Sequence, residues 1–206
     1  MIKNISCVYD EFLAIKTEID SADSGIARKI YIDYGPTCYS VLEDLFVKYP
    51  FAQNDHFVDF GCGKGRVLIM AAYHGCAMLT GYELATDRYE ILTSNVRSFK
   101  GKHETTSVFS LLNENVEDIS IPDTTNKFFF TNSFHLKVHM KILDKIHSSL
   151  LREKREILLF FHRPDDSIVK YVDRLDSFEK IDLADYRYWP DINAHKYFEL
   201  VVYKNI

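Results

Sequence analysis

The sequence predicts an α/β fold: a doubly wound, mostly parallel seven-stranded sheet with an antiparallel C-terminal hairpin strand and helices on both faces. From residue 56 onward, apolar runs of strand length alternate with helical patterns, as parallel strands joined by helical crossovers require. The last two apolar runs, 178–189 and 196–205, are too close in sequence for a helical crossover. We therefore expect them to form an antiparallel hairpin at one edge of the sheet.

The other elements follow in a regular order. Five further strands are predicted, at 56–60, 77–83, 106–112, 127–134 and 155–164. The run "KFFF" that begins at residue 127 is typical of a strand buried on both faces. Helices are predicted between the strands, at 65–74, 85–99, 137–151 and 167–175. Gly75 is expected to end the first of these helices.

Two helical patterns precede the first strand of this alternation. One lies near 7–19, within residues 1–35, which we interpret as an N-terminal helical extension or lid. The other follows Thr37, which is predicted to be its N-cap. Residues 36–206 are then expected to form a single domain.

Composition limits the possible partners. The net charge is -5 and hydrophobic residues make up 47% of the chain, which predicts a globular protein without a general phosphate-binding surface. No apolar stretch reaches membrane-spanning length, and the acidic N-terminal residues are unlike a secretory signal. The four cysteines form no C-x-x-C pair. The expectation is a cytoplasmic protein with free thiols, no membrane partner and no metal site.

A glycine-rich loop follows the first strand of the alternation. Gly61, Gly63 and Gly65 permit a tight turn and a close approach of a ligand to the backbone, in the unit where doubly wound folds bind nucleotides. The spacing is G-x-G-x-G, which differs from the G-x-G-x-x-G of dinucleotide binders. Asp59, two residues before the first glycine, would repel a pyrophosphate but would favour a cationic or zwitterionic ligand. Nicotinamide-dependent oxidoreduction is therefore a disfavoured alternative.

A second acid follows the second strand. Glu83 lies 20 residues after Gly63, at the distance from which an acid accepts hydrogen bonds from ribose hydroxyls. Together with Asp59, it predicts a ligand that carries adenosine but no phosphates. S-adenosylmethionine, with its sulfonium, ammonium and carboxylate groups, fits both acids.

The stretches "VDFGCGKGR" and "GYEL" resemble motifs I and II of the class I, seven-strand, Rossmann-like S-adenosylmethionine-dependent methyltransferases, over about residues 36–206. This resemblance implies a methyltransferase (EC 2.1.1.-) that releases S-adenosylhomocysteine. It implies that the glycine loop packs against the methionine part of the cofactor, with Asp59 near it, and that Glu83 holds the ribose. Asn115 lies where the family usually offers an acid to the adenine amine.

The end of the fourth strand faces the transferred methyl group in this family. Here it reads Asn132, Ser133 and Phe134, whereas nucleic-acid amino-methyltransferases place Asn/Asp-Pro-Pro-Tyr/Phe at this position. The missing prolines disfavour a base amine as the acceptor. Asn132 is the candidate for orienting the acceptor, with a strand-end cap as the alternative, and Phe134 is a candidate for the substrate pocket.

Further aromatic residues flank the predicted site. Tyr31 and Tyr34 precede the first helix of the domain, and Trp189 lies in the hairpin loop, so all three are substrate-pocket candidates, with ordinary packing as the alternative. Lys64 and Arg66 are interpreted as a solvated helix start rather than as phosphate ligands.

The combination of "YGPT", "GCGKGR" and "GYEL" resembles small methyltransferases with protein-lysine or unassigned substrates. The resemblance therefore implies a methyltransferase that acts on a nitrogen or oxygen nucleophile, of a protein (lysine) or of a small molecule. A non-catalytic cofactor-binding module is one alternative. A nucleic-acid methyltransferase is the other, and it would need a basic face that the linear sequence does not reveal. The sequence identifies neither the methyl acceptor nor the oligomeric state.

Overall fold

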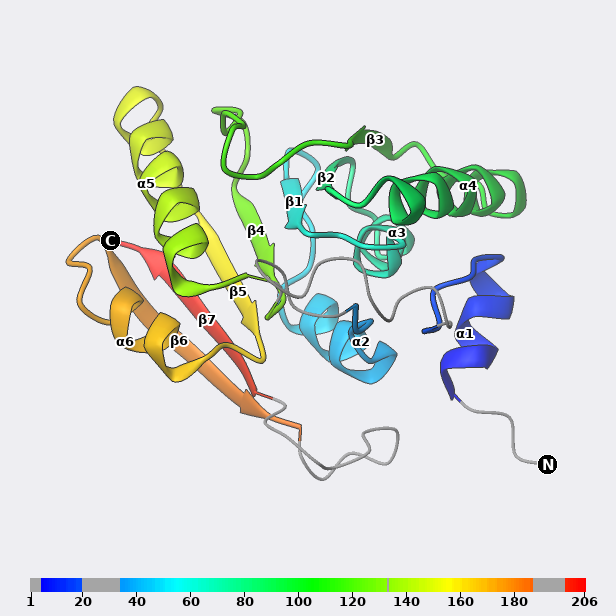
Figure 1. The fold of residues 1–206 in the computed structure, drawn as a ribbon, viewed down its shortest axis with the longest axis horizontal. Coiled ribbons are helices and arrows are strands. Elements are labelled where there is room, and N and C mark those ends of the chain that lie inside the picture. The colour runs from blue at the N-terminus through cyan, green and yellow to red at the C-terminus, as the bar shows by residue number, and fades with distance from the viewer. Residues whose placement is uncertain (1–4, 20–33, 133, 187–198) are drawn as a thin grey trace.

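The computed structural model describes residues 5–19, 34–132, 134–186 and 199–206. Its strands form one seven-stranded sheet in the order β3-β2-β1-β4-β5-β7-β6 (Figure 1). The strands are β1 (His56–Phe60), β2 (Met78–Tyr82), β3 (Val108–Leu112), β4 (Lys127–Phe130), β5 (Leu158–His162), β6 (Phe178–Asp185) and β7 (Glu199–Asn205). The helices are α1 (Ile5–Leu13), α2 (Tyr39–Lys48), α3 (Arg66–Tyr73), α4 (Thr86–Lys102), α5 (Leu136–Arg152) and α6 (Asp166–Val172).

The pairing of the strands confirms the predicted fold class. Strands β1 to β5 pair in parallel, whereas β7 pairs antiparallel with both β5 and β6. The predicted C-terminal hairpin is therefore present, with β6 as the outer strand and β7 inserted beside β5. All four residues of β4 are buried, as its apolar sequence predicts.

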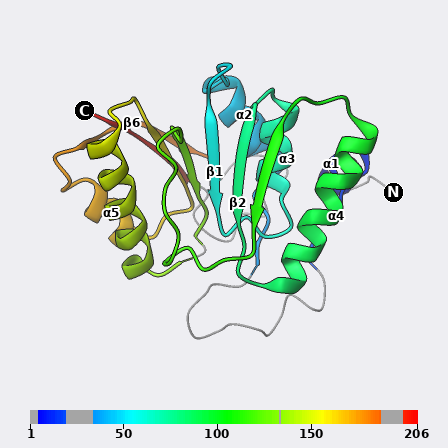
Figure 2. The ribbon, with the colours of Figure 1, turned by 90° about the horizontal axis from the view of Figure 1, so that it is seen from above.

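Helices cover both faces of the sheet (Figures 1 and 2). Residues of α2, α3 and α4 share one apolar cluster with residues on one face of the sheet, such as Phe57 and Phe129. Residues of α5 and α6 form a second cluster with residues of the opposite face, such as Val58 and Phe128. Because neighbouring residues of one strand point to opposite faces, each strand contributes to both clusters.

The start of the chain differs from the prediction in two respects. Helix α1 ends at Leu13 rather than near residue 19, because Ala14 adopts a positive φ of 58° that breaks the helix. Ile15 beyond it is buried in the same cluster as the core of the sheet. The predicted N-cap at Thr37 is wrong: Cys38 occupies that position without a side-chain cap. The Thr37 hydroxyl instead lies 3.5 Å from Nδ1 of His162 at the end of β5.

Within the described ranges, no helix is long and apolar enough to cross a membrane.

Candidate cofactor site

A cavity of about 540 Å³ lies at the carboxyl ends of β1, β2 and β4. This volume is typical of small-molecule pockets, roughly 300–1,000 Å³, and the location is where open α/β sheets bind ligands. Its wall combines the loops that follow these strands with the segment before α2. The lining residues are Tyr34, Gly35, Pro36, Thr37, Asp59, Gly61, Cys62, Arg66, Val67, Tyr82, Glu83, Leu84, Ala85, Thr86, Asp87, Arg88, Glu114, Val116, Thr131 and Phe134.

The glycine loop is shaped by its own backbone and by the end of β2. The backbone N–H groups of Gly61 and Cys62 both donate to the carbonyl oxygen of Tyr82, each at 2.9 Å. Gly63 has a φ of +55°, and a Cβ at this position would lie 2.5 Å from Cε2 of Tyr34. Only glycine therefore allows the Tyr34 ring to pack directly on the loop.

Asp59 is the most unusual charged group of the site. Its side chain lines the cavity and is 1% exposed, and neither carboxylate oxygen has a hydrogen-bond partner within the described part of the chain. Burial, and then the nearby Glu83 carboxylate, raise the pKa of Asp59 well above its ordinary value. A buried carboxylate without a partner is costly, so this position suits a ligand that brings a positive charge.

Glu83 has a structural role that the sequence did not reveal. One carboxylate oxygen accepts a hydrogen bond from Gly63 N at 2.9 Å, and the other accepts from Ala85 N at 2.8 Å. Glu83 thereby holds the glycine loop against the end of β2. Burial raises its pKa in spite of these bonds. Each carboxylate oxygen retains a lone pair, so ribose hydroxyls could still be bound.

The structure brings together only part of the predicted site. Asp59, Gly61, Glu83, Tyr34 and Phe134 line the cavity, whereas Gly63 and Gly65 are not among its lining residues. Tyr31 and Trp189 lie outside the described residues.

The ends of β3 and β4 present one residue that the sequence predicted, Phe134, and several that it did not. Among the residues described, the cavity wall includes Thr131 and Phe134 but not Asn132, and Glu114 and Val116 but not Asn115. The Asn115 side chain instead accepts a hydrogen bond from Glu117 N at 3.0 Å, which stabilises a local turn. The roles proposed for Asn132 and Asn115 therefore have no support from the shape of the cavity.

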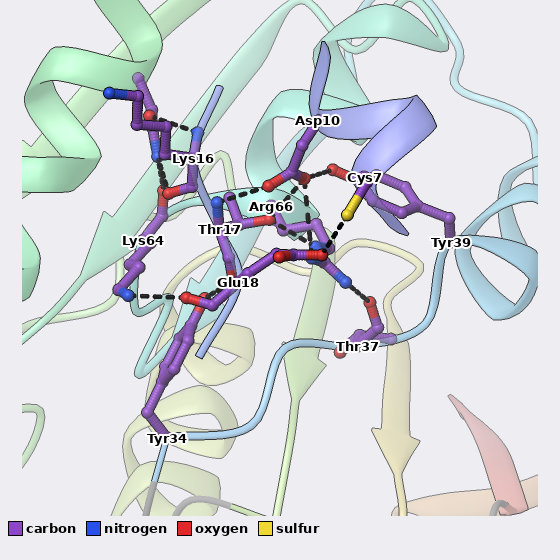
Figure 3. Close-up of polar contacts among 11 residues, drawn as sticks. Cys7, Asp10, Lys16, Thr17, Glu18, Tyr34, Thr37, Tyr39, Lys64 and Arg66 are labelled. Atoms are coloured by element: carbon purple, nitrogen blue, oxygen red, sulfur yellow. Dashed lines mark hydrogen bonds and ion pairs between the residues drawn. The ribbon is translucent and has the colours of Figure 1, made fainter. Parts of the chain in front are cut away.

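Lys64 and Arg66 do not form a solvated helix start, and that interpretation is corrected. Their exposed fractions are 3% and 4%. Arg66 donates from Nε to Thr17 Oγ1 at 2.7 Å and from Nη1 to the carbonyl of Thr37 at 3.1 Å. Figure 3 shows its guanidinium between the N-terminal segment and the segment before α2. The sequence signal was its place directly after the third glycine, but its partners lie far away in the chain.

The two histidines buried beside the site are neutral at physiological pH. Burial lowers the pKa of His139 to about 4 and that of His162 to about 3. Within the described ranges, no three His, Cys, Asp or Glu side chains are grouped so that they could hold a metal ion.

The sheet order, the glycine loop and the two acids at the ends of β1 and β2 define the class I S-adenosylmethionine-dependent methyltransferase fold. A family model described as "Histone methylation protein DOT1" matches residues 30–146. The chain belongs to this family of methyltransferases. None of the curated proteins compared with the chain matches it.

Solved structures share the fold at low sequence identity. Magnesium protoporphyrin IX methyltransferase (ChlM) from Synechocystis PCC 6803 with bound S-adenosylmethionine has a TM-score of 0.58 and 10% identity, over 81% of this chain and 77% of that chain. An RNA methyltransferase from Salinibacter ruber in complex with S-adenosylhomocysteine has a TM-score of 0.57 and 15% identity, over 84% and 94%. The tRNA (uracil-54, C5)-methyltransferase from Pyrococcus abyssi in complex with S-adenosylhomocysteine has a TM-score of 0.58 and 16% identity, over 84% of this chain and 40% of that chain.

Proposed function

We propose that this methyltransferase binds S-adenosylmethionine in the cavity at the ends of β1, β2 and β4 and transfers its methyl group to an amine, with a protein lysine favoured over a small molecule. The observation that carries the cofactor assignment is the buried, unpartnered carboxylate of Asp59 on the cavity wall. An ammonium group of the ligand would supply the missing charge and hydrogen-bond donors.

Other residues of the wall fit the remaining parts of the cofactor. Glu83 offers carboxylate lone pairs to the ribose hydroxyls from a position already fixed by two backbone bonds. Arg66 provides a positive charge beside the glycine loop, which suits the carboxylate of the methionine part. When bound, the cofactor supplies a methyl carbon activated by the sulfonium.

The chain's own residues then have to orient the acceptor and exclude water. Thr131 and Phe134 line the cavity after β4, where they could contact an acceptor. An amine must lose its proton before it attacks, since only the neutral form has a free lone pair. Transfer leaves the acceptor as a methylated ammonium and the cofactor as S-adenosylhomocysteine, and the methylated ammonium can then release a proton to solvent.

The charge of the cavity wall favours a cationic acceptor. Apart from Asp59, Glu83 and Arg66, which are assigned to the cofactor, its charged residues are the acidic Asp87 and Glu114 and the basic Arg88. An excess of acidic side chains attracts a lysine ammonium and repels the phosphodiester backbone of a nucleic acid. The family description, which refers to histone methylation, supports the same acceptor.

Labelling of a cell extract with tritiated cofactor tests the proposal. We expect label in the protein fraction, on lysine after hydrolysis, and much less label when Asp59→Asn replaces the native protein at a limiting concentration of cofactor. Label confined to RNA or to small molecules would contradict the lysine acceptor. Absence of cofactor binding by calorimetry would contradict the proposal as a whole.

A further inference from the structure

The N-terminal segment is tied to the glycine loop through one buried side chain of α4. Asn95 is 4% exposed. Its Oδ1 accepts a hydrogen bond from Lys16 N at 2.9 Å, and its Nδ2 donates to the Lys16 carbonyl at 3.0 Å. The same Nδ2 donates to the carbonyl of Lys64, between the glycines, at 2.8 Å. A single amide thus pairs with the N-terminal backbone as a strand would, and it also holds the loop.

The other bonds between these segments reinforce this link. We refer to residues 14–18, which follow α1, as the strap. Lys64 Nζ donates to the strap carbonyl of Glu18 at 2.8 Å, and the Tyr34 hydroxyl donates to that of Thr17 at 2.8 Å (Figure 3). The Tyr34 ring also lies under Lys64 Nζ, 5.0 Å from its centroid. Lys64, between Gly63 and Gly65, is therefore held by Asn95 through its backbone carbonyl and by the strap through its side chain.

The strap is itself ordered by a buried acid of α1. Asp10 accepts hydrogen bonds from Thr17 N at 2.6 Å and from Thr17 Oγ1 at 2.7 Å. Its carboxylate also accepts from the Tyr39 hydroxyl and lies 3.6 Å from Arg66 Nη2. Because Arg66 follows the glycine loop and lines the cavity, both flanks of the loop depend on the position of the strap.

We propose that Asn95 is a positioning residue for cofactor binding: it couples the docking of the strap to the ligand-binding conformation of the glycine loop, so that each strengthens the other. This inference rests on the proposed function, because the ligand of the loop is taken to be the cofactor. Coupling between two sites is reciprocal. If strap docking tightens cofactor binding by a given factor, the cofactor must stabilise strap docking by the same factor.

Two measurements on the full chain test the coupling. Asn95→Ala should weaken S-adenosylhomocysteine binding in calorimetry by about 5- to 150-fold, the usual range for coupled sites. Ser98→Ala, at an exposed position of the same helix, should leave the dissociation constant unchanged. In the native protein, saturating S-adenosylhomocysteine should slow hydrogen exchange of the Lys16 amide, which bonds to Asn95, by a similar factor.

A purely structural role gives a different pattern. It predicts that Asn95→Ala lowers the thermal midpoint while the dissociation constant stays unchanged, and this result would overturn the inference. If Asn95→Ala does not fold, the native protein still decides, because unchanged exchange at Lys16 on ligand binding would equally overturn it. Thr17→Val provides a near-isosteric second variant, for which weaker binding is expected. Failure of the native protein to bind the ligand would instead contradict the proposed function.

Discussion

Replacing Asp59 by asparagine should make the ligand-free protein more stable and the cofactor complex weaker. The carboxylate is 1% exposed and both of its oxygens lack partners among the described residues, so its ionised form is destabilised by burial. The amide has nearly the same shape but no charge. An unsatisfied buried polar group costs about 1–3 kcal/mol, and the amide still has polar atoms to satisfy. We therefore expect the free energy of unfolding of the ligand-free variant to rise by about 1 kcal/mol, near the lower end of this range, and its thermal midpoint to rise by roughly 2–4 °C.

The dependence on pH has a defined sign. The pKa of Asp59 is raised in the folded, ligand-free protein, so the folded state keeps its proton to a higher pH than the unfolded chain does. The stability of the native protein therefore falls as pH rises from the ordinary value of 3.8 through the raised pKa. The variant lacks this loss. Its advantage should be absent below about pH 4 and fully present above the raised pKa.

The ligand should reverse the order of stabilities. Loss of a charge-assisted hydrogen bond, about 1.5–3 kcal/mol, should raise the dissociation constant for S-adenosylhomocysteine by about 10- to 150-fold. At a ligand concentration of about 100 times its dissociation constant, the native protein gains about 2.7 kcal/mol and becomes the more stable of the two. Differential scanning calorimetry from pH 4 to 8, with and without ligand, measures both effects.

Asp55 provides a matched control just before the amino end of β1. Although burial favours its neutral form, hydrogen bonds from Lys127 and then Asn126 hold the pKa of Asp55 below its ordinary value. Its carboxylate lies 2.6 Å from Lys127 Nζ. Asp55→Asn should therefore destabilise the protein and leave ligand affinity unchanged. The reasoning about Asp59 is refuted if Asp59→Asn is less stable than the native protein at pH 8, or if it binds the ligand equally well.

Two further substitutions test the surroundings of the loop. Glu83→Gln replaces one carboxylate oxygen by an amide nitrogen, which cannot accept the backbone hydrogen bond, so binding of S-adenosylhomocysteine should weaken about tenfold. The variant should also prefer S-adenosylhomocysteine over its 2′-deoxyribose analogue by a smaller factor than the native protein does. Calorimetry with both ligands measures this, and an undiminished preference would argue against a contact with the ribose. Gly81→Ala would place a Cβ 2.4 Å from Leu68 Cδ1 and 2.9 Å from Cys62 Sγ, so the free energy of unfolding in urea should fall by about 1–3 kcal/mol; an unchanged value would contradict the tight packing of α3 on β2.

The sheet was predictable because its signals are local and redundant. Each strand is a short apolar run, each crossover has helical periodicity, and the short link between the last two strands leaves only an antiparallel pairing. The boundaries were less predictable. Helix α1 ends early because of the positive φ at Ala14, and alanine carries no sequence signal for that conformation.

The directions of side chains at the strand ends are less accessible from the sequence than the strands themselves. Asn132 and Asn115 were chosen by position in a motif, but whether a side chain enters a cavity depends on the direction in which the backbone leaves the strand. In this structure, Thr131, Phe134 and Glu114 line the wall. The direction of a loop is decided by packing against other segments, which a linear pattern does not contain.

The sequence by itself determined the backbone of the glycine loop and the positions of the acids beside it. Glycine spacing, Asp59 and Glu83 are written in residue type and distance along the chain, because a tight turn after a strand has local requirements. Only the tertiary structure decided how those acids are charged and held. Lys64 and Arg66 look solvated in the sequence, yet both are buried by a strap that lies 46 and 49 residues earlier in the chain. Burial and partner choice depend on contacts between distant segments, and these exist only once the chain has folded.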